Sequence, residues 1–155
     1  MKELNGIKYI ERLPVVSTEK TPLFVLIHGY GSNEEDLFSF AQDLPQNAHI
    51  VSVRALHDIV YGGYAWYDIN FVNNEKWMDE EQAIESRNKL VEFIDTIVQQ
   101  EKLDDKNVTL MGFSQGAILS YAISLNHPEK IKNVAILSGY PEHKIIGKID
   151  ASNDF

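Results

Sequence analysis

The sequence contains no cysteine among its 155 residues. Within these residues, a disulfide framework, a thiolate metal site and a cysteine nucleophile are therefore excluded. The absence says nothing about redox compartment, because a chain without cysteine tolerates either state. Stability must come from a hydrophobic core, and a chain of this length can bury one within a single domain. We therefore expect residues 1–155 to belong to one domain.

Long apolar runs and an excess of positive charge are also missing. Residues 1–6 lack the apolar core of a signal peptide, and no run approaches the roughly 18 apolar residues that span a membrane. The formal net charge is −9, which disfavours binding to nucleic-acid phosphates and to anionic membrane surfaces. These absences favour a cytoplasmic protein with no membrane span and no nucleic-acid partner.

What the sequence does contain is an alternation of apolar strand-like runs and helical segments. Strands are expected at residues 8–13, 23–27, 49–53 and 134–137, with another leading into Gly112. Helices are expected after a capping box at residues 32–35, from residues 79–81 onward, and after Ser114, whereas residues 54–78 read as irregular and rich in aromatics. Alternating strands and helices predict an α/β fold, with a mostly parallel sheet flanked by helices and a site at the carboxyl ends of the strands.

The most informative segment is Gly112-Phe113-Ser114-Gln115-Gly116, between an apolar β-branched run and an apolar helical stretch. Gly-x-Ser-x-Gly in this setting is typical of a nucleophile elbow. The two glycines permit a very tight turn, and the serine is expected in a strained backbone conformation. The turn would present the serine hydroxyl at the carboxyl end of the strand, beside the first N–H of a helix. The alternative is a coincidental glycine turn.

A second segment, His28-Gly29-Tyr30-Gly31, follows the apolar run at residues 23–27. Acyl transfer by serine needs donors for the oxyanion, a base, and a group that orients the base. In α/β-hydrolases a loop at this place supplies the second oxyanion N–H. The alternative is an ordinary strand-to-helix turn. We expect His28 to hold this loop rather than to act as a base.

Three segments together resemble the phospholipase/carboxylesterase family of α/β-hydrolases, which includes the acyl-protein thioesterases and small bacterial carboxylesterases. They are residues 26–37, residues 62–68, and residues 112–117 with 137–140. The resemblance runs over nearly all of the chain, in order and at plausible spacing. It implies an α/β-hydrolase fold and the hydrolysis of small carboxylic esters or thioesters through an acyl-serine intermediate, with no metal or organic cofactor.

The resemblance also implies roles for individual residues. Ser114 is the expected nucleophile, and the backbone N–H groups of Tyr30 and Gln115 are the expected oxyanion hole. Gly29, Tyr64 and Trp66 are expected to bind substrate near the active-site mouth. For the two aromatic residues, ordinary core or loop packing is an equally good interpretation.

The family orders its triad as Ser, Asp and His, with both partners beyond the strand that ends near Ser138. No segment of that kind occurs before Phe155. His143 follows the last expected strand on the correct side for a base, whereas His127 lies at a helix end. We therefore expect the N-terminal portion of a longer α/β-hydrolase, truncated after the strand near residues 134–137 and inactive or impaired by itself.

This interpretation has a consequence for association and leaves other functions open. Residues 134–137 would form an exposed apolar edge with unpaired backbone groups, so the chain should self-associate or pair with a missing C-terminal segment. One alternative function is a noncatalytic hydrolase-like domain that binds a ligand or partner. Another is a self-sufficient enzyme with a displaced base such as His143.

Overall fold

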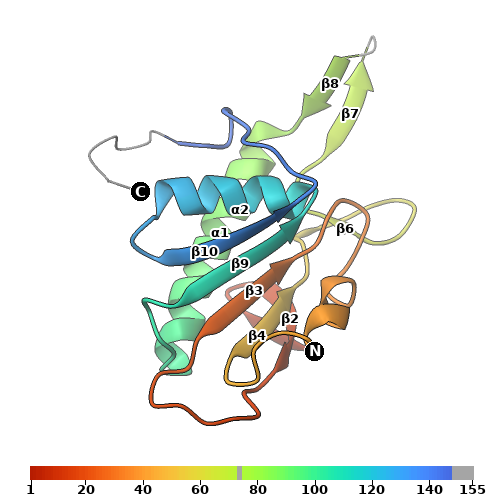
Figure 1. Cartoon of the computed structure of the whole chain (residues 1–155). Coiled ribbons are helices and arrows are strands. Elements are labelled where there is room, and N and C mark those ends of the chain that lie inside the picture. Colours follow the sequence, from red (N-terminus) through yellow and green to blue (C-terminus); the bar gives the residue numbers. More distant parts are fainter. Residues whose placement is uncertain (73–74, 148–155) are drawn as a thin grey trace.

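The computed structural model describes residues 1–72 and 75–147, and a six-stranded sheet lies at its centre (Figure 1). The strands are β1 (Lys2–Leu4), β2 (Ile7–Arg12), β3 (Leu23–Ile27), β4 (His49–Val53), β9 (Val108–Phe113) and β10 (Ile131–Leu137). They lie side by side in the order β1-β2-β4-β3-β9-β10. The last four in this order are parallel, whereas β1 and β2 pair antiparallel at the other end. The predicted mostly parallel sheet is confirmed.

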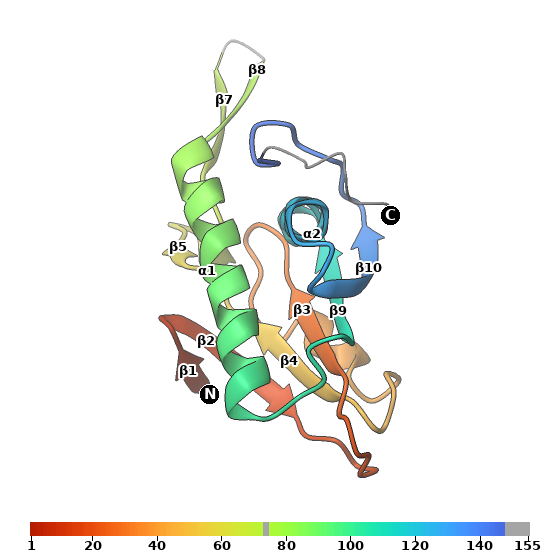
Figure 2. The ribbon, with the colours of Figure 1, turned by 90° about the vertical axis from the view of Figure 1, so that its left-hand side faces the viewer.

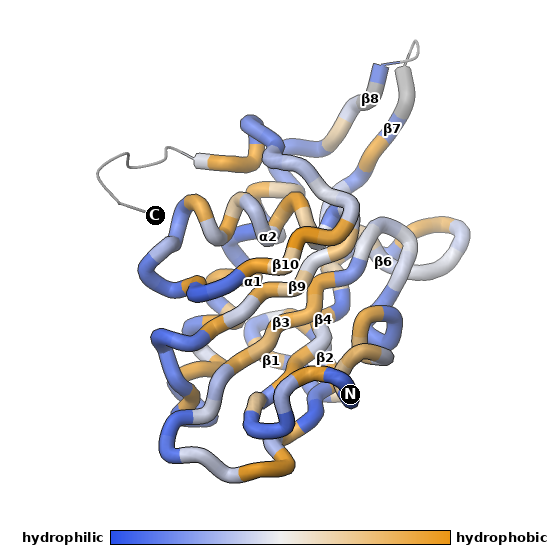
Figure 3. The backbone as a smooth tube through the Cα atoms, viewed as in Figure 1, coloured by the Kyte–Doolittle hydropathy of each residue, from blue (hydrophilic) through white to orange (hydrophobic). Residues whose placement is uncertain are grey.

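Strand β3 lies between β4 and β9, in the middle of the parallel part. Four of its five residues are buried, as expected for a strand that is covered on both faces. Hydrophobic colouring continues along β3 and β9 in Figure 3. Because successive side chains of a strand point to opposite faces, Val25 and Ile27 join one core cluster and Leu26 joins the other.

Two helices, α1 (Glu80–Gln100) and α2 (Gln115–Asn126), contribute to the larger core cluster on one face of the sheet (Figures 1 and 2). The beginning of α1 agrees with the sequence, because Asp79 caps it and accepts the N–H of Gln82 at 3.0 Å. None of the helices in the described residues is both long enough and apolar enough to cross a membrane.

The helix expected after residues 32–35, which the apolar positions extend through Leu44 to a stop near Pro45, is wrong in extent. Only a short 3-10 turn, η1 (Leu37–Phe40), forms on the second face of the sheet, and it is preceded by Asp36 without a side-chain cap. The guanidinium group of Arg12 explains the early end of this turn. It donates to four backbone carbonyls, those of Ala41, Leu44, Pro45 and Ala48, at 2.5–3.3 Å. These carbonyls point at a side chain from β2 instead of at the N–H groups of a next helical turn.

Residues 54–78 contain more regular structure than the sequence indicated. They include the short strands β5 (His57–Asp58) and β6 (Tyr64–Ala65), and the hairpin of β7 (Ile69–Val72) and β8 (Glu75–Met78). The hairpin projects beyond the end of the sheet in Figures 1 and 2. These strands are only two to four residues long, which is too short to produce a clear alternating pattern.

Among the described residues, β10 is one of the two edge strands of the sheet, as the sequence predicted, although it begins at Ile131 rather than at Val134. Its residues 132–135 are exposed. After β10 the chain turns back over the helices, where Ile145 is buried and its carbonyl accepts from the Arg87 guanidinium at 2.5 Å. The remainder of the tail, for which no regular pattern was predicted, lies outside the described residues from position 148 onward.

Candidate active site

Ser114 lies at the junction between β9 and α2. Its backbone has φ 52° and ψ −114°, a left-handed conformation that few residues other than glycine adopt. Such a conformation costs on the order of 1–3 kcal/mol and is kept where the surrounding structure determines it. The Ser114 N–H donates to the carbonyl of Leu137 at 2.9 Å, which ties the turn to the end of β10. The strained elbow expected from the sequence is therefore present.

The glycine at position 116 allows α2 to approach the end of β3. A Cβ atom there would overlap the backbone carbonyl of Ile27 and lie 2.8 Å from that of His28. The glycine at position 112 is equally tight, because its Cβ would overlap the backbone of Gly116. Only glycine fits at these two positions, and their packing brings the N-terminus of α2 against the loop that follows β3.

This loop after β3 reaches the serine. A Cβ atom on Gly29 would lie 3.1 Å from the Cβ of Ser114. The Ser114 hydroxyl has no hydrogen-bond partner among residues 1–72 and 75–147. The same part of the chain offers no partner to the backbone N–H groups of Tyr30 and Gln115. The site thus combines an uncommitted hydroxyl with two uncommitted amides, one of them at a helix N-terminus.

His28 holds the loop from within. Its imidazole is fully buried, Nδ1 lies 2.7 Å from the carbonyl oxygen of Gly29, and Nε2 lies 3.0 Å from the backbone nitrogen of Ala55. Since the Ala55 N–H must donate to Nε2, the ring is neutral with its proton on Nδ1. Burial lowers the pKa of His28 and so favours this neutral form. The residue serves loop geometry, as the sequence analysis anticipated.

Trp66 is fully buried and belongs to the main core cluster. Its indole N–H donates to the carbonyl of His28 at 2.9 Å. This placement fits the packing alternative, and a contact between Trp66 and substrate stays a prediction.

Tyr64 is half-buried and lies beside the same loop. Its backbone exchanges hydrogen bonds with the loop, accepting from Gly31 at 2.9 Å and donating to Ser32 at 2.8 Å. The guanidinium carbon of Arg54 lies 4.4 Å above the centre of its ring. The tyrosine therefore supports the loop and keeps part of its surface accessible.

Two contributions to the site were missed by sequence reasoning. The buried side chain of Gln115 accepts from the N–H of Trp66 at 3.1 Å and donates to the carbonyl of Tyr67 at 2.7 Å. The buried carboxylate of Glu34 receives two hydrogen bonds from Arg54, at 2.6 and 2.7 Å. No local pattern signals either contact, because the partners are separated by 48–49 and 20 residues, respectively.

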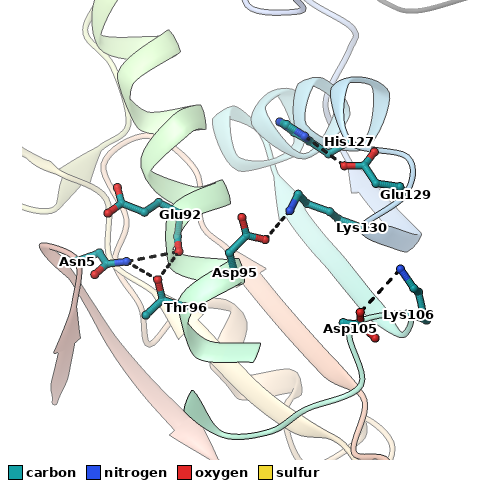
Figure 4. A network of polar contacts seen from close by, with 9 residues as sticks. All are labelled: Asn5, Glu92, Asp95, Thr96, Asp105, Lys106, His127, Glu129 and Lys130. Atoms are coloured by element: carbon teal, nitrogen blue, oxygen red, sulfur yellow. Dashed lines mark hydrogen bonds and ion pairs between the residues drawn. The ribbon is translucent and has the colours of Figure 1, made fainter. Parts of the chain in front are cut away.

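None of the five histidines donates to or accepts from the Ser114 hydroxyl. His49 pairs with Glu11 on β2. His127 lies at the C-terminal end of α2, opposite the end that carries Ser114, and is near Glu129 (Figure 4). His143 is exposed in the turn after β10. No group of three or more possible metal ligands forms in the described part of the chain. The general base and its orienting acid are thus not assigned by this geometry.

The strained serine elbow, the parallel sheet and the adjoining glycine loop define an α/β-hydrolase. The sequence profile of the phospholipase/carboxylesterase family matches residues 12–149, and the chain belongs to this family. The predicted family and fold class are therefore confirmed.

Individual relatives agree with this assignment. Acyl-protein thioesterase 1 homolog 1 of Dictyostelium discoideum is 34% identical over 133 residues, which cover 79% of this chain and 59% of that protein. The crystal structure of esterase PE8 has a TM-score of 0.73 at 26% identity, covering 86% of this chain and 64% of that one. The Bacillus cereus carboxylesterase has a TM-score of 0.62 at 25% identity, with coverage of 83% and 57%. The chain thus spans 57–64% of the length of these relatives.

Proposed function

We propose that the protein hydrolyses carboxylic esters or thioesters through an acyl-serine intermediate on Ser114. The observation that carries this proposal is the convergence of three uncommitted groups: the Ser114 hydroxyl and the backbone N–H groups of Tyr30 and Gln115. The glycine loop lies against the serine, and the elbow holds the serine in a strained conformation. Membership of the family and the names of its relatives support the same reaction class.

In the proposed reaction, Ser114 Oγ bonds to the carbonyl carbon of the substrate and passes its proton to a base. Negative charge develops on the carbonyl oxygen, which the Tyr30 and Gln115 amides stabilise. Each such donor is worth roughly 3 kcal/mol in the transition state. The C–O or C–S bond to the leaving group then breaks as that group takes up a proton. Water attacks the acyl-serine in a second step of the same kind and releases the acid.

The base is proposed to be a His, and its orienting acid an Asp, both from outside the described residues. This proposal rests on the described histidines, none of which contacts Ser114. A serine without a base is a poor nucleophile at its ordinary pKa. The 155-residue chain alone is therefore proposed to be impaired, keeping only the contribution of the oxyanion amides and of substrate binding, about 10³-fold over water in triad-deficient serine hydrolases.

The substrate is proposed to be a small-molecule ester that enters over Gly29. Gly29 lies directly against Ser114 and the Phe113 ring, and the residues Tyr30 and Phe113 are about two-fifths exposed. Tyr64 is proposed as a residue of the rim, since it is half-buried beside this loop.

A fluorophosphonate probe tests the proposal directly. Labelling of Ser114, located by peptide mass spectrometry and lost in Ser114→Ala, would support a competent nucleophile. Ser120→Ala is a matched control, because Ser120 is buried within α2 and bonded to the Gly116 carbonyl. Absence of labelling in the chain, even when it is extended with the C-terminal part of a relative, would contradict the proposal.

An absence of labelling in the extended chain would favour the second candidate function, a noncatalytic hydrolase-like binding domain. The observation in its favour is the lack of any histidine on the Ser114 hydroxyl. Regained turnover of p-nitrophenyl acetate in the extended chain would decide for the enzyme.

A further inference from the structure

The two loops that carry the Tyr30 and Gln115 amides are joined by one short segment, Trp66–Tyr67. On one side, the side chain of Gln115 brackets this segment, accepting from the Trp66 N–H at 3.1 Å and donating to the Tyr67 carbonyl at 2.7 Å. On the other side, the Trp66 indole N–H donates to the carbonyl of His28, two residues before Tyr30, at 2.9 Å. A single residue thus contacts both halves of the site.

Trp66 is itself anchored to a helix. The hydroxyl of Ser86, which is buried on α1, donates to the Trp66 carbonyl at 2.5 Å. The indole packs at 5.6 Å, centre to centre, against the ring of His28. Its backbone N–H and carbonyl, together with its indole N–H, are therefore all committed, and the residue is fully buried. Buried hydrogen bonds of this kind fix geometry, because an unmade one would cost its full desolvation.

The His28 carbonyl shows why the indole contact matters. This carbonyl follows directly after β3 and has the tightly packed Gly116 on one side, where a Cβ would come within 2.8 Å. The chain continues from it through Gly29 to the Tyr30 amide. Oxyanion donors act through preorganisation, so a shift of about 1 Å between the two amides would cost up to 100-fold in rate.

We propose that Trp66 is a positioning residue that sets the separation of the Tyr30 and Gln115 amides, through its indole N–H on one loop and its backbone N–H on the other. The inference rests on the proposed function only for its effect on rate. The coupling of the two loops through Trp66 is a statement about structure and can be tested without catalysis.

The test replaces the indole N–H without changing the shape of the side chain. The sequence has two tryptophans, Trp66 and Trp77, and Trp77 is half exposed on β8. In a Trp77→Phe background, position 66 can be filled with β-(3-benzothienyl)alanine, in which sulfur replaces the N–H. The Trp77→Phe protein with normal Trp66 is the matched control. Ser86→Ala is a second variant, which removes the anchor on α1 and serves if the analogue protein does not fold.

The first readout is amide hydrogen exchange measured by NMR, which needs no activity. Two amides report on the loop after β3: Gly31, which donates to Tyr64, and Ala55, which donates to the His28 ring. Exchange at both is expected to rise about tenfold in the analogue protein, whereas Val25 in the middle of β3 stays unchanged. Unchanged exchange at Gly31 and Ala55 in both variants would overturn the proposal.

The second readout is the steady-state turnover of p-nitrophenyl acetate, in the chain extended as above. We expect kcat to fall about tenfold and KM to change less than twofold, because transition-state stabilisation is lost while substrate binding is kept. A rise in KM with kcat unchanged would overturn the positioning role. If the control protein shows no acylation at all, the proposed function fails, and the exchange experiment still decides whether Trp66 couples the two loops.

Discussion

Gly29 and Ser114 face each other closely enough that a methyl group on the glycine would lie 3.1 Å from the serine Cβ. The φ angle of Gly29 is not in the left-handed region, so an alanine there would be crowded without being strained in its backbone. Gly29→Ala should therefore push the Ser114 side chain or the ring of Phe113 by a few tenths of an ångström. We expect the rate of fluorophosphonate labelling to fall about tenfold, with little change in thermal stability.

Gly147→Ala is the control for this prediction. A Cβ there would meet the Asn126 side chain at 3.0 Å, a comparable crowding at a place remote from the elbow. It should leave the labelling rate unchanged. A Gly29→Ala protein that is labelled at the wild-type rate would show that the loop is not held against the serine.

The buried imidazole of His28 predicts a pH dependence of stability. Burial lowers its pKa in the folded protein below the ordinary value of 6.5. Below pH 6.5 the unfolded chain therefore binds a proton that the folded protein does not. The stabilisation that comes from keeping the His28 imidazole neutral is complete above pH 6.5. It is lost as the pH falls toward the folded pKa, by up to about 1.4 kcal/mol per pH unit.

Urea unfolding of the wild type and of His28→Gln between pH 5 and 8 measures this contribution. Glutamine can both donate and accept a hydrogen bond, but it does not titrate. The difference in the free energy of unfolding between the two proteins should therefore narrow as the pH falls. Glu34, Asp36 and Arg54 are the charged groups that act on His28, and both proteins keep them. A difference that stays constant over the whole range would contradict a buried neutral imidazole.

How much of this could be read from the sequence differs between elements. Strand β3 and the elbow were predictable, because a continuous apolar run and Gly-x-Ser-x-Gly each reflect a local requirement of backbone packing. The start of α1 was predictable for the same reason, since Asp79 caps its own helix. The limits of η1 were not, because they depend on Arg12, which is distant in sequence and binds the carbonyls that a longer helix would use.

The site shows the same division. The roles of Ser114, Tyr30 and Gln115 stay predictions, made from their places at strand and helix ends and from the family resemblance. The structure brings the loops that carry them together. The role of the Trp66 side chain could not be read, because a tryptophan in an irregular segment fits a core position as well as a binding surface. Burial was decided by contacts with His28 and Gln115, which lie 38 and 49 residues away.

The paired Glu34 and Arg54 offer a separate test of what holds the loop after β3. The Glu34 carboxylate is 3% exposed and its pKa is lowered, chiefly by the hydrogen bonds from Arg54. Glu34→Gln removes the charge of one partner and should destabilise the protein by about 3 kcal/mol at pH 7, as is typical when one partner of a buried pair is lost.

The pH dependence of this effect has a definite sign. The folded pKa of Glu34 lies below its ordinary value of 4.5, so the stabilisation is present above pH 4.5 and is lost as the pH falls through the folded pKa. The destabilisation by Glu34→Gln, measured by urea unfolding, should therefore shrink below pH 4.5. Asp105→Asn is the control, because its pair with Lys106 is exposed and contributes little.

The outer edge of β10 leads to a prediction about association. The strand pairs only with β9 within the described residues, and its residues 132–135 are exposed. Beside it, a groove of about 500 Å³ runs along α2 between Tyr121 and Pro128. An exposed edge strand with free backbone groups invites pairing with another strand. We therefore expect the chain to self-associate, or to bind a polypeptide corresponding to the C-terminal part of its relatives.

Sedimentation velocity across a range of protein concentrations measures this directly. Val134→Lys should shift the distribution toward monomer, because a lysine on an edge strand opposes pairing. Ile84→Lys on α1 is a closely matched control, since Ile84 and Val134 are both 37% exposed. A wild-type chain that stays monomeric at high concentration, and that binds no such polypeptide, would show that the β10 edge is protected by its own local structure. Equal shifts in both variants would mean that general surface hydrophobicity, rather than the open edge of the sheet, drives association.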